Sequence, residues 1–137
     1  MNDSKKLQVS INSFSYKKGI PDDSTGNGGG FVFDCRGIHN PGRYERYMCL
    51  TGKDKEVIEF FKKNSRIDEF LGKVMKVVDI NIQCFIERGF TDLMINFGCT
   101  GGQHRSVYCA ENFGRLLEQK YGVTVSVKHH EIDEAIK

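Results

Sequence analysis

The sequence predicts one α/β domain: a small, mainly parallel sheet of about four strands flanked by about three helices, with a glycine loop at a strand-to-helix junction. Three observations predict this class. Apolar runs typical of strands occur near both ends of the chain and before the glycine loop. Longer segments repeat apolar residues at every third or fourth position, as amphipathic helices do. Strand, helix and strand also follow one another, and that order favours parallel pairing.

Length and composition bound the class of protein. A chain of 137 residues, 39% hydrophobic and 28% charged, fits a single globular domain spanning 1–137. The net charge of +2 is too small to imply nucleic acid by itself. The five cysteines, an odd count with no close pair, argue against a disulfide scaffold and favour a reducing compartment, and the absence of CxxC spacing argues against a zinc knuckle. No signal peptide or membrane span is present, so we expect a cytoplasmic protein without a membrane partner.

The first part of the chain predicts two strands separated by a loop. Residues 7–14 alternate apolar and polar side chains, which indicates a half-buried strand. Residues 24–30 are rich in glycine and predict a flexible loop. Residues 31–36 form a short second strand. Asp34 and Arg36 lie two positions apart at its end, so their side chains should point to the same face.

Helices and a last strand are predicted further along. Thr51, with an acid three residues later, indicates a helix start that continues through Phe61. A longer helix is expected over 67–86, ended by Gly89. After the glycine loop, apolar residues over 107–121 indicate another helix closed by glycine, and 123–127 alternate as a strand. The cysteines outside the glycine loop are expected to be small buried residues, namely Cys35, Cys49, Cys84 and Cys109.

The segment 92–107 is the predicted functional centre, because an apolar strand leads through a glycine loop into a helix. The first N–H groups of a helix have no intrahelical partner, and the helix dipole adds partial positive charge there. Gly101 and Gly102 allow a ligand to approach the backbone. Arg105 can make a two-pronged contact with a phosphate or carboxylate. Hydroxyl groups are available from Thr100 and Ser106.

Two other chemistries compete for this loop. Cys99 and Arg105 have the spacing of cysteine-dependent phosphatases, in which a thiolate attacks the bound phosphate. This phosphatase is the alternative to a binding domain without catalysis. Together with Cys99, the histidines His104, His129 and His130 are candidate metal ligands. The short ligand spacings of typical metal sites are missing, so we expect neither a metal nor another cofactor.

Basic and aromatic residues interleave in a second segment. Arg43, Tyr44, Arg46 and Tyr47 could clamp and stack single-stranded RNA. The competing interpretation is a solvated loop with extended side chains. The predicted RNA contacts comprise this cluster and three lysines: Lys17, Lys18, Arg43, Tyr44, Arg46, Tyr47 and Lys53.

Several segments together resemble a known family. Residues 98–107, GCTGGQHRSV, resemble the hallmark of the C-terminal domain of the RapZ family, bacterial RNase adapter proteins. Residues 13–21 resemble the opening motif of that domain. Other matching segments, in the family's order, are Phe33-Asp34-Cys35-Arg36, Asn40-Pro41, Thr51-Gly52 with Asp54, and Lys128-His129. The resemblance therefore covers nearly the whole chain.

The resemblance implies a domain that senses a phosphorylated amino sugar, such as glucosamine 6-phosphate, and helps to recognise a small regulatory RNA or a ribonuclease. It leaves a homo-oligomer open. The ligand-binding residues that the resemblance and the loop chemistry together imply are Asp34, Arg36, Cys99, Thr100, Gly101, Gly102, His104, Arg105, Ser106 and His129.

Three departures from the family pattern qualify what the resemblance implies. The nucleotide-binding P-loop half of full-length members is absent from the sequence, so ATP or GTP binding is not expected. His130 stands where the family tends to have arginine. Residues 131–137 are acidic where the family has a basic tail, which removes positive charge available to RNA phosphates.

Overall fold

Within residues 6–132, which the computed structural model describes, four strands form one sheet in the order β2-β3-β1-β4. All three neighbouring pairs are parallel, so the predicted α/β class is confirmed. The acidic end of the chain over 133–137 lies outside the described residues. The strands are β1 (Gln8–Ser15), β2 (Phe31–Asp34), β3 (Asp92–Cys99) and β4 (Thr124–His129).

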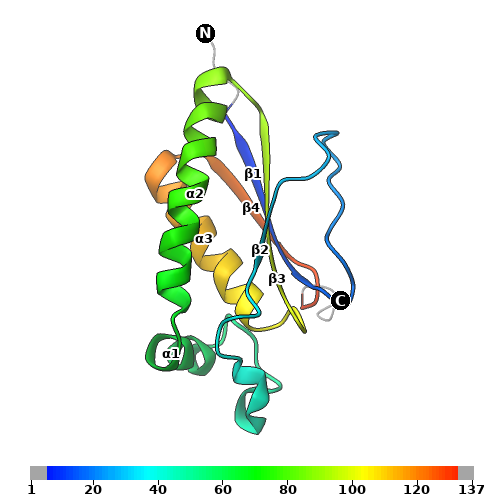
Figure 1. The fold of residues 1–137 in the computed structure, drawn as a ribbon, viewed down its shortest axis with the longest axis vertical. Helices are drawn as coiled ribbons and strands as arrows, with labels where there is room; N and C mark the ends of the chain where they lie inside the picture. Colours follow the sequence, from blue (N-terminus) through cyan, green and yellow to red (C-terminus); the bar gives the residue numbers. More distant parts are fainter. Residues whose placement is uncertain (1–5, 133–137) are drawn as a thin grey trace.

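The main helices cover one face of the sheet. Figure 1 shows α2 and α3 on one side and the long β1–β2 connection on the other. This arrangement makes each parallel crossover right-handed, as nearly all such connections are. The helices are α1 (Lys55–Asn64), α2 (Ile67–Arg88) and α3 (Arg105–Tyr121), and the 3-10 turns are η1 (Pro41–Arg43) and η2 (Glu45–Tyr47).

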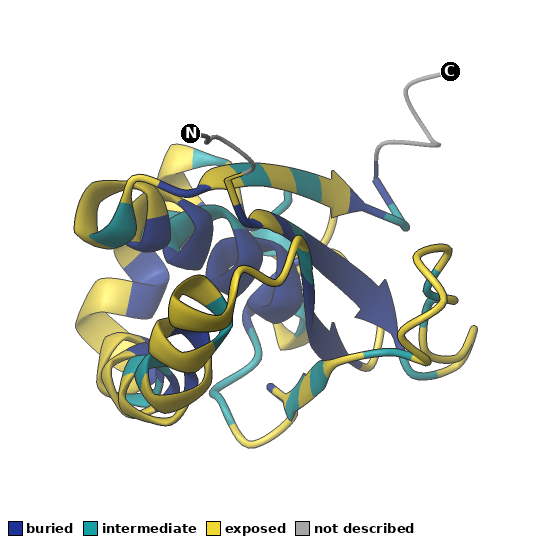
Figure 2. Ribbon diagram, turned by 90° about the horizontal axis from the view of Figure 1, so that it is seen from above, coloured by how far each residue is buried: buried dark blue, intermediate teal, exposed yellow. Residues whose placement is uncertain are grey.

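Burial follows strand order. The middle strands are buried over almost their whole length, whereas β2 and β4 are half-buried or exposed at most positions. Figure 2 shows the buried side of the helices turned toward the sheet. Ile11 and Ile95 are each 1% exposed or less and pack with Phe113 from α3 in the core. The long apolar run before the glycine loop is therefore a central strand, as parallel sheets require.

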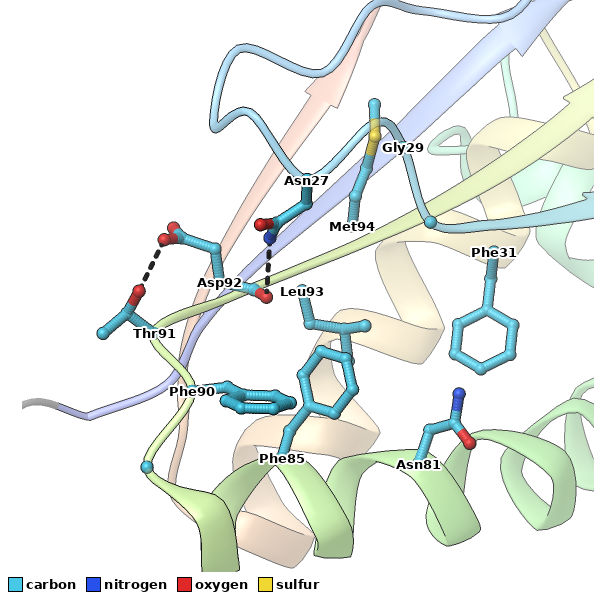
Figure 3. Close-up of a pocket in the computed structure, with 12 residues that line it drawn as sticks. Asn27, Gly29, Phe31, Asn81, Phe85, Phe90, Thr91, Asp92, Leu93 and Met94 are labelled. Atoms are coloured by element: carbon cyan, nitrogen blue, oxygen red, sulfur yellow. Dashed lines mark hydrogen bonds between the residues drawn. The ribbon is translucent and has the colours of Figure 1, made fainter.

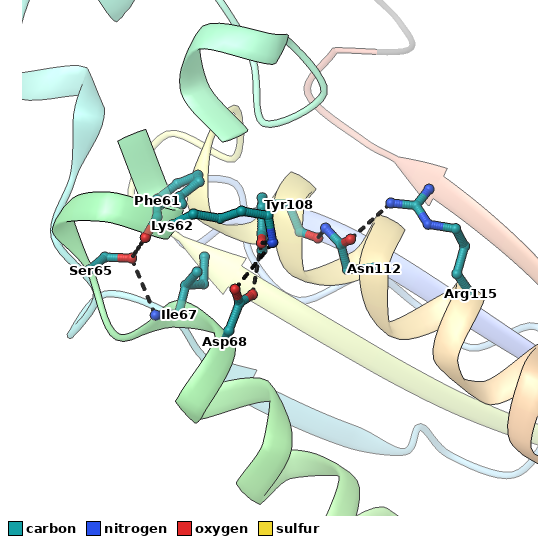
Figure 4. A network of polar contacts seen from close by, with 8 residues as sticks. All are labelled: Phe61, Lys62, Ser65, Ile67, Asp68, Tyr108, Asn112 and Arg115. Carbon is teal, nitrogen blue, oxygen red and sulfur yellow. Dashed lines mark hydrogen bonds and ion pairs between the residues drawn. The ribbon is translucent and has the colours of Figure 1, made fainter. Parts of the chain in front are cut away.

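The corner between α1 and α2 is fixed to α3 by polar contacts (Figure 4). The hydroxyl of Tyr108 donates to Asp68 at 2.7 Å and accepts from Lys62 at 3.2 Å. Ser65 accepts the N–H of Ile67 and donates to the carbonyl of Phe61. These contacts position the N-terminal half of α3, which carries the glycine loop at its head.

The helix boundaries differ from the prediction at one place. The first helix begins at Lys55 with Asp54 as its N-cap, and not at Thr51. The Asp54 carboxylate accepts the N–H of Thr51 at 2.7 Å, and Thr51 accepts the N–H of Lys53, so the capping residues form a separate turn. The expected end of α2 at Gly89 is confirmed.

Two of the cysteine predictions are wrong. Cys49 and Cys84 are exposed, whereas Cys35 and Cys109 are buried as expected. Cys84 lies on the solvent side of α2, and Cys49 follows η2 in an exposed turn. The sulfur atoms of Cys35 and Cys109 are 3.8 Å apart in the core, where burial raises the pKa of the Cys109 thiol.

Gly89→Ala should lower the free energy of unfolding by about 1 kcal/mol. Gly89 ends α2 with φ of 73°, a left-handed conformation that an alanine Cβ disfavours, and no other atom would hinder that Cβ. Urea unfolding followed by circular dichroism measures the effect. An unchanged midpoint would show that the chain reaches another conformation at this turn without cost.

Candidate anion-binding site

The carboxyl ends of the four described strands meet at one edge of the sheet, and the glycine loop over 100–104 lies there (Figure 1). The β1 strand fixes this loop by two contacts. The Ser15 hydroxyl donates to the carbonyl of Thr100 at 2.6 Å, and the N–H of Tyr16 donates to the carbonyl of Cys99 at 3.0 Å. Ligands of open α/β sheets bind at this edge.

Glycine is required at position 102. Its φ is 72°, and a Cβ there would lie 2.9 Å from the backbone nitrogen of Ser15. The same Cβ would meet the side chain of Glu131 at 2.5 Å. The loop therefore lies directly against the end of β1, so close that only glycine, which has no Cβ, fits at this position.

The backbone amides of the glycine loop are unpaired within the described chain. Among residues 6–132, no acceptor pairs with the N–H groups of Gly101, Gly102, Gln103 or His104. His104 is the N-cap of α3 and caps no amide with its side chain; instead, its ring Nε2 bonds the carbonyl of Tyr47 at 2.9 Å. The head of α3 thus keeps donors for an anion, which the helix dipole also favours.

Arg105 contributes a buried positive charge. The residue is 5% exposed, and its Nη1 donates to the carbonyls of Arg36 at 2.9 Å and Ile38 at 3.1 Å. Its Nη2 lies 3.5 Å from the Thr100 hydroxyl, and its buried Nε has no hydrogen-bond partner among the described residues. None of the ion pairs found within residues 6–132 includes this guanidinium. A buried charge of this kind favours a bound anion.

A hollow of about 220 Å³ adjoins the loop. Nine residues line it, five that the sequence analysis predicted and four that it did not. The predicted ones are Cys99, Thr100, Gly101, His104 and Arg105, and the others are Asn40, Gly42, Met48 and Gln103. The Asn40-Pro41 pair is already part of the family resemblance. It is the sequence signal that could have indicated that residues 40–48 also line the hollow.

Cys99 lies at the base of the hollow. It is 2% exposed, its thiol donates to the Ser106 hydroxyl at 3.2 Å, and its sulfur accepts the N–H of Ser106 at 3.4 Å. Ser106 is fully buried and does not line the hollow itself. These contacts tie the end of β3 to the first turn of α3 and fix the shape of the loop.

Asp34 and Arg36 lie at the same edge of the sheet, outside the lining of the hollow. The Arg36 guanidinium donates to both carboxylate oxygens of Asp34, at 2.9 and 2.8 Å. The two side chains thus meet as predicted, but across a turn and not along a strand, because β2 ends at Asp34 and not at Arg36. The guanidinium also stacks 3.9 Å from the ring centroid of Tyr16. Both side chains are half-exposed, which makes this pair easy to exchange for a ligand contact.

Acid titration should reveal the Asp34–Arg36 contact. The Arg36 side chain donates to the ionised carboxylate and lowers the pKa of Asp34 from its ordinary value of 3.8. A carboxyl with a pKa lowered by folding stabilises the fold above its unfolded pKa, and the effect is lost as pH falls through the folded pKa. We expect the Asp34 carboxyl carbon to titrate with a midpoint below 3.8 in NMR spectra. Arg36→Gln should raise that midpoint; equal midpoints would contradict the assignment.

His129 is buried beside the loop and contacts protein groups. It is 2% exposed, its Nδ1 bonds the Ser13 hydroxyl at 2.7 Å and its Nε2 bonds the Glu111 carboxylate at 2.7 Å. The next residue, His130, points to the other face of the sheet and bonds Asn12. His129 therefore links β4, β1 and α3 beneath the site.

The predicted RNA-contact residues occupy the same end of the molecule. Tyr44 and Tyr47 pack on Phe60, and the Arg46 guanidinium lies 4.9 Å from the ring centroid of Tyr47. Most side chains of the set are exposed, including Lys17, Lys18, Arg43 and Lys53. The Lys18 ammonium lies 3.5 Å from the Glu131 carboxylate. The tyrosines thus have a structural role on one side and solvent on the other.

Comparison with known proteins decides the family. The family profile described as the RapZ C-terminal domain matches residues 7–133. This chain belongs to the RapZ C-terminal domain family. The chain is 39% identical over 134 residues to a nucleotide-binding protein of Thermotoga neapolitana, covering 98% of this chain and 46% of that protein.

Two further bacterial relatives also match nearly the whole chain. A nucleotide-binding protein of Cereibacter sphaeroides is 40% identical over 93% of this chain and 40% of its own length. One from Fervidobacterium nodosum is 37% identical over 94% of this chain and 44% of its own length. The chain therefore spans less than half the length of these curated relatives. In the described part of this RapZ C-terminal domain, no helix is long and apolar enough to cross a membrane.

Proposed function

We propose that this chain binds a phosphorylated amino sugar, of the glucosamine 6-phosphate kind, in the hollow at the head of α3. One observation carries the proposal: three loop residues with unpaired amides, Gly101, Gln103 and His104, line the same small hollow as Arg105. The buried guanidinium of Arg105 has no carboxylate partner among the described residues. Amides at a helix N-terminus and a forked guanidinium are the groups that bind phosphate in proteins.

The size of the hollow favours a single sugar ring. Its volume of about 220 Å³ is well below the roughly 300–1,000 Å³ of clefts that enclose drug-sized ligands. A nucleotide would extend far outside it. With phosphate at Gly101 and Arg105, the sugar ring would lie toward Asn40 and Met48.

The amine of the sugar needs a hydrogen-bond acceptor at the carboxyl ends of the strands, near the hollow. Asp34 supplies a carboxylate there, and its exposed pair with Arg36 contributes little to stability. A ligand ammonium can therefore replace Arg36 as the partner of Asp34. The released Arg36 would then be available to the phosphate.

The proposed role includes the partners expected of the family. In the cytoplasm, the bound sugar would control contact with an RNA or a ribonuclease through the exposed basic residues near the site. The hydrogen bond from the His104 ring to the carbonyl of Tyr47 joins the glycine loop to the cluster over 43–47. A change of the loop on binding would reach Tyr47 through this bond.

Calorimetric titration with glucosamine 6-phosphate tests the proposal. We expect saturable binding that is lost with unphosphorylated glucosamine and weaker with glucose 6-phosphate. The phosphatase alternative predicts turnover of an aryl phosphate that Cys99→Ser abolishes. Binding without turnover, retained in Cys99→Ser, favours the sensor; absence of binding at millimolar sugar phosphate would remove the proposal.

Arg43→Ala combined with Arg46→Ala should weaken binding of a structured RNA by about tenfold, because each lost cation removes one phosphate contact. A gel shift at two salt concentrations measures this, and the salt dependence should become shallower. Arg66→Ala combined with Arg88→Ala, two exposed arginines on α2 and its N-cap, is the matched control. Equal losses in both double variants would remove the 43–47 cluster from the proposed RNA surface.

A further inference from the structure

A second hollow lies at the other end of β3, beside the start of the strand (Figure 3). Its volume of about 730 Å³ is more than three times that of the anion hollow. Leu93 and Met94 line it from the sheet, Phe85 and Asn81 line it from α2, and the connection around Gly29 closes another side. None of its lining residues belongs to the site at the glycine loop.

The hollow exists because β2 is shorter than β3. β2 has four residues and pairs only with Ile95 to Gly98, whereas β3 begins at Asp92. Over the first residues of β3, the outer edge of the sheet therefore has no strand beside it. Figure 3 shows the chain passing from Phe31 over Gly29 to Asn27, whose amide reaches the carbonyl of Asp92.

This edge presents an unpaired donor beside a weakly paired acceptor. Even-numbered residues of β3 direct their backbone groups outward, as the bonds to the carbonyls of Gly98 and Asp92 show. Met94 is 7% exposed, and its N–H has no acceptor among residues 6–132. The carbonyl of Asp92 accepts only the exposed Asn27 amide, at 3.5 Å. The Met94 N–H and the Asp92 carbonyl are therefore both available to a molecule that enters the hollow.

Aromatic rings flank the donor and acceptor. The rings of Phe85 and Phe90 meet edge to face at 4.9 Å, and Phe31 lies across the hollow from Phe85 (Figure 3). The one ionisable side chain of the lining, the carboxylate of Asp92, already accepts the hydroxyl of Thr91 at 2.8 Å. The lining therefore favours a flat, neutral molecule over an ion.

We propose that this hollow binds a neutral planar heteroaromatic molecule, with its ring between Phe31 and Phe85 and with a neighbouring acceptor and donor on one edge. The acceptor takes the N–H of Met94, and the donor bonds the carbonyl of Asp92 in place of the Asn27 amide. An extended peptide does not fit this edge. Gly30 already lies so close that its Cβ would be 2.0 Å from the carbonyl oxygen of Met94, which closes the path of a longer strand.

Adenine is a suitable probe because its N1 acceptor adjoins the N6 amino donor. Titration followed by ¹H–¹⁵N spectra should shift the amide signals of Met94 and Gly30 and leave those of Gly101 and His104 unmoved. N6,N6-dimethyladenine lacks the donor and should bind about tenfold more weakly, because the carbonyl of Asp92 loses its partner. An unmoved Met94 signal at millimolar adenine, or equal affinity for both bases, would overturn the proposal.

Variants in α2 test whether adenine contacts the aromatic ring of Phe85 or only an apolar surface. Phe85→Leu keeps an apolar side chain and removes the ring, and should weaken adenine binding about fivefold. Ile80→Ala, at a position 73% exposed on the same helix, is the control and should leave the affinity unchanged. Thermal unfolding verifies that both variants fold. Equal affinities in wild type and Phe85→Leu, or competition between adenine and inorganic phosphate, would overturn the proposed site.

Discussion

Arg105→Ala is expected to weaken binding of glucosamine 6-phosphate by about 100-fold or more, because charged hydrogen bonds contribute about 1.5–3 kcal/mol each and the guanidinium can make two to a phosphate. Arg105 is 5% exposed and has a buried Nε without a partner in the described chain, so the cation is positioned for an anion before one binds. Isothermal titration calorimetry measures the loss. A Kd within threefold of the wild type would show that the guanidinium does not contact the ligand.

The same substitution also removes structural contacts, and the experiment must separate the two effects. Arg105 holds the carbonyls of Arg36 and Ile38, so the variant should unfold at a lower temperature than the wild type. Arg105→Lys keeps the charge without the fork and should bind with intermediate affinity. Arg66→Ala, whose side chain is 82% exposed and pairs with Glu69, is the control for loss of a surface cation and should change neither property.

A ligand that binds Arg105 should itself stabilise the fold. Binding to the native state alone raises the free energy of unfolding by about 2.7 kcal/mol at a ligand concentration 100 times Kd. A rise in unfolding temperature with glucosamine 6-phosphate, absent in Arg105→Ala, would therefore report binding at this position independently of calorimetry. Unphosphorylated glucosamine gives the baseline for this comparison.

The sequence predicted the elements whose signal is local. The apolar period over 67–86 and the glycine at 89 predicted α2 and its end, and the 98–107 segment placed the loop at the head of a helix. The start of α1 was less clear, because Thr51 and Asp54 pair with each other in a turn of their own. Exposed Cys84 was missed because periodicity alone does not indicate which small apolar residues face solvent.

The rest of the site depends on contacts between distant segments. The 39–52 segment reaches the glycine loop through the bonds from His104 to the carbonyl of Tyr47 and from Gly52 to the carbonyl of Gln103. Nothing in the local pattern specifies these bonds, so Gly42 and Met48 were not expected in the lining. The predicted parallel topology did indicate that the carboxyl ends of all strands lie at one edge of the sheet. It could not predict that Asp34 pairs with Arg36 and that His129 turns to Glu111.

Gly52→Ala is expected to reduce the free energy of unfolding by about 2–3 kcal/mol, the cost of overpacking a well-filled position. A Cβ at position 52 would lie 2.3 Å from the carbonyl oxygen of His104 and 2.5 Å from the backbone nitrogen of Tyr108. Both neighbours belong to the head of α3 and cannot move aside as a flexible side chain would. Chemical unfolding with urea measures the change.

Gly72→Ala provides a matched control on α2. A Cβ at position 72 meets no atom within 4 Å, and alanine in a helix interior is favoured over glycine by about 1 kcal/mol. The same chemical change should therefore stabilise at position 72 and destabilise at position 52. Sugar-phosphate binding should weaken only in Gly52→Ala. The added methyl group would push the 39–52 segment away from the head of α3, and this movement would open one wall of the hollow. If both variants lose stability equally, the close approach of Gly52 does not hold the glycine loop in place.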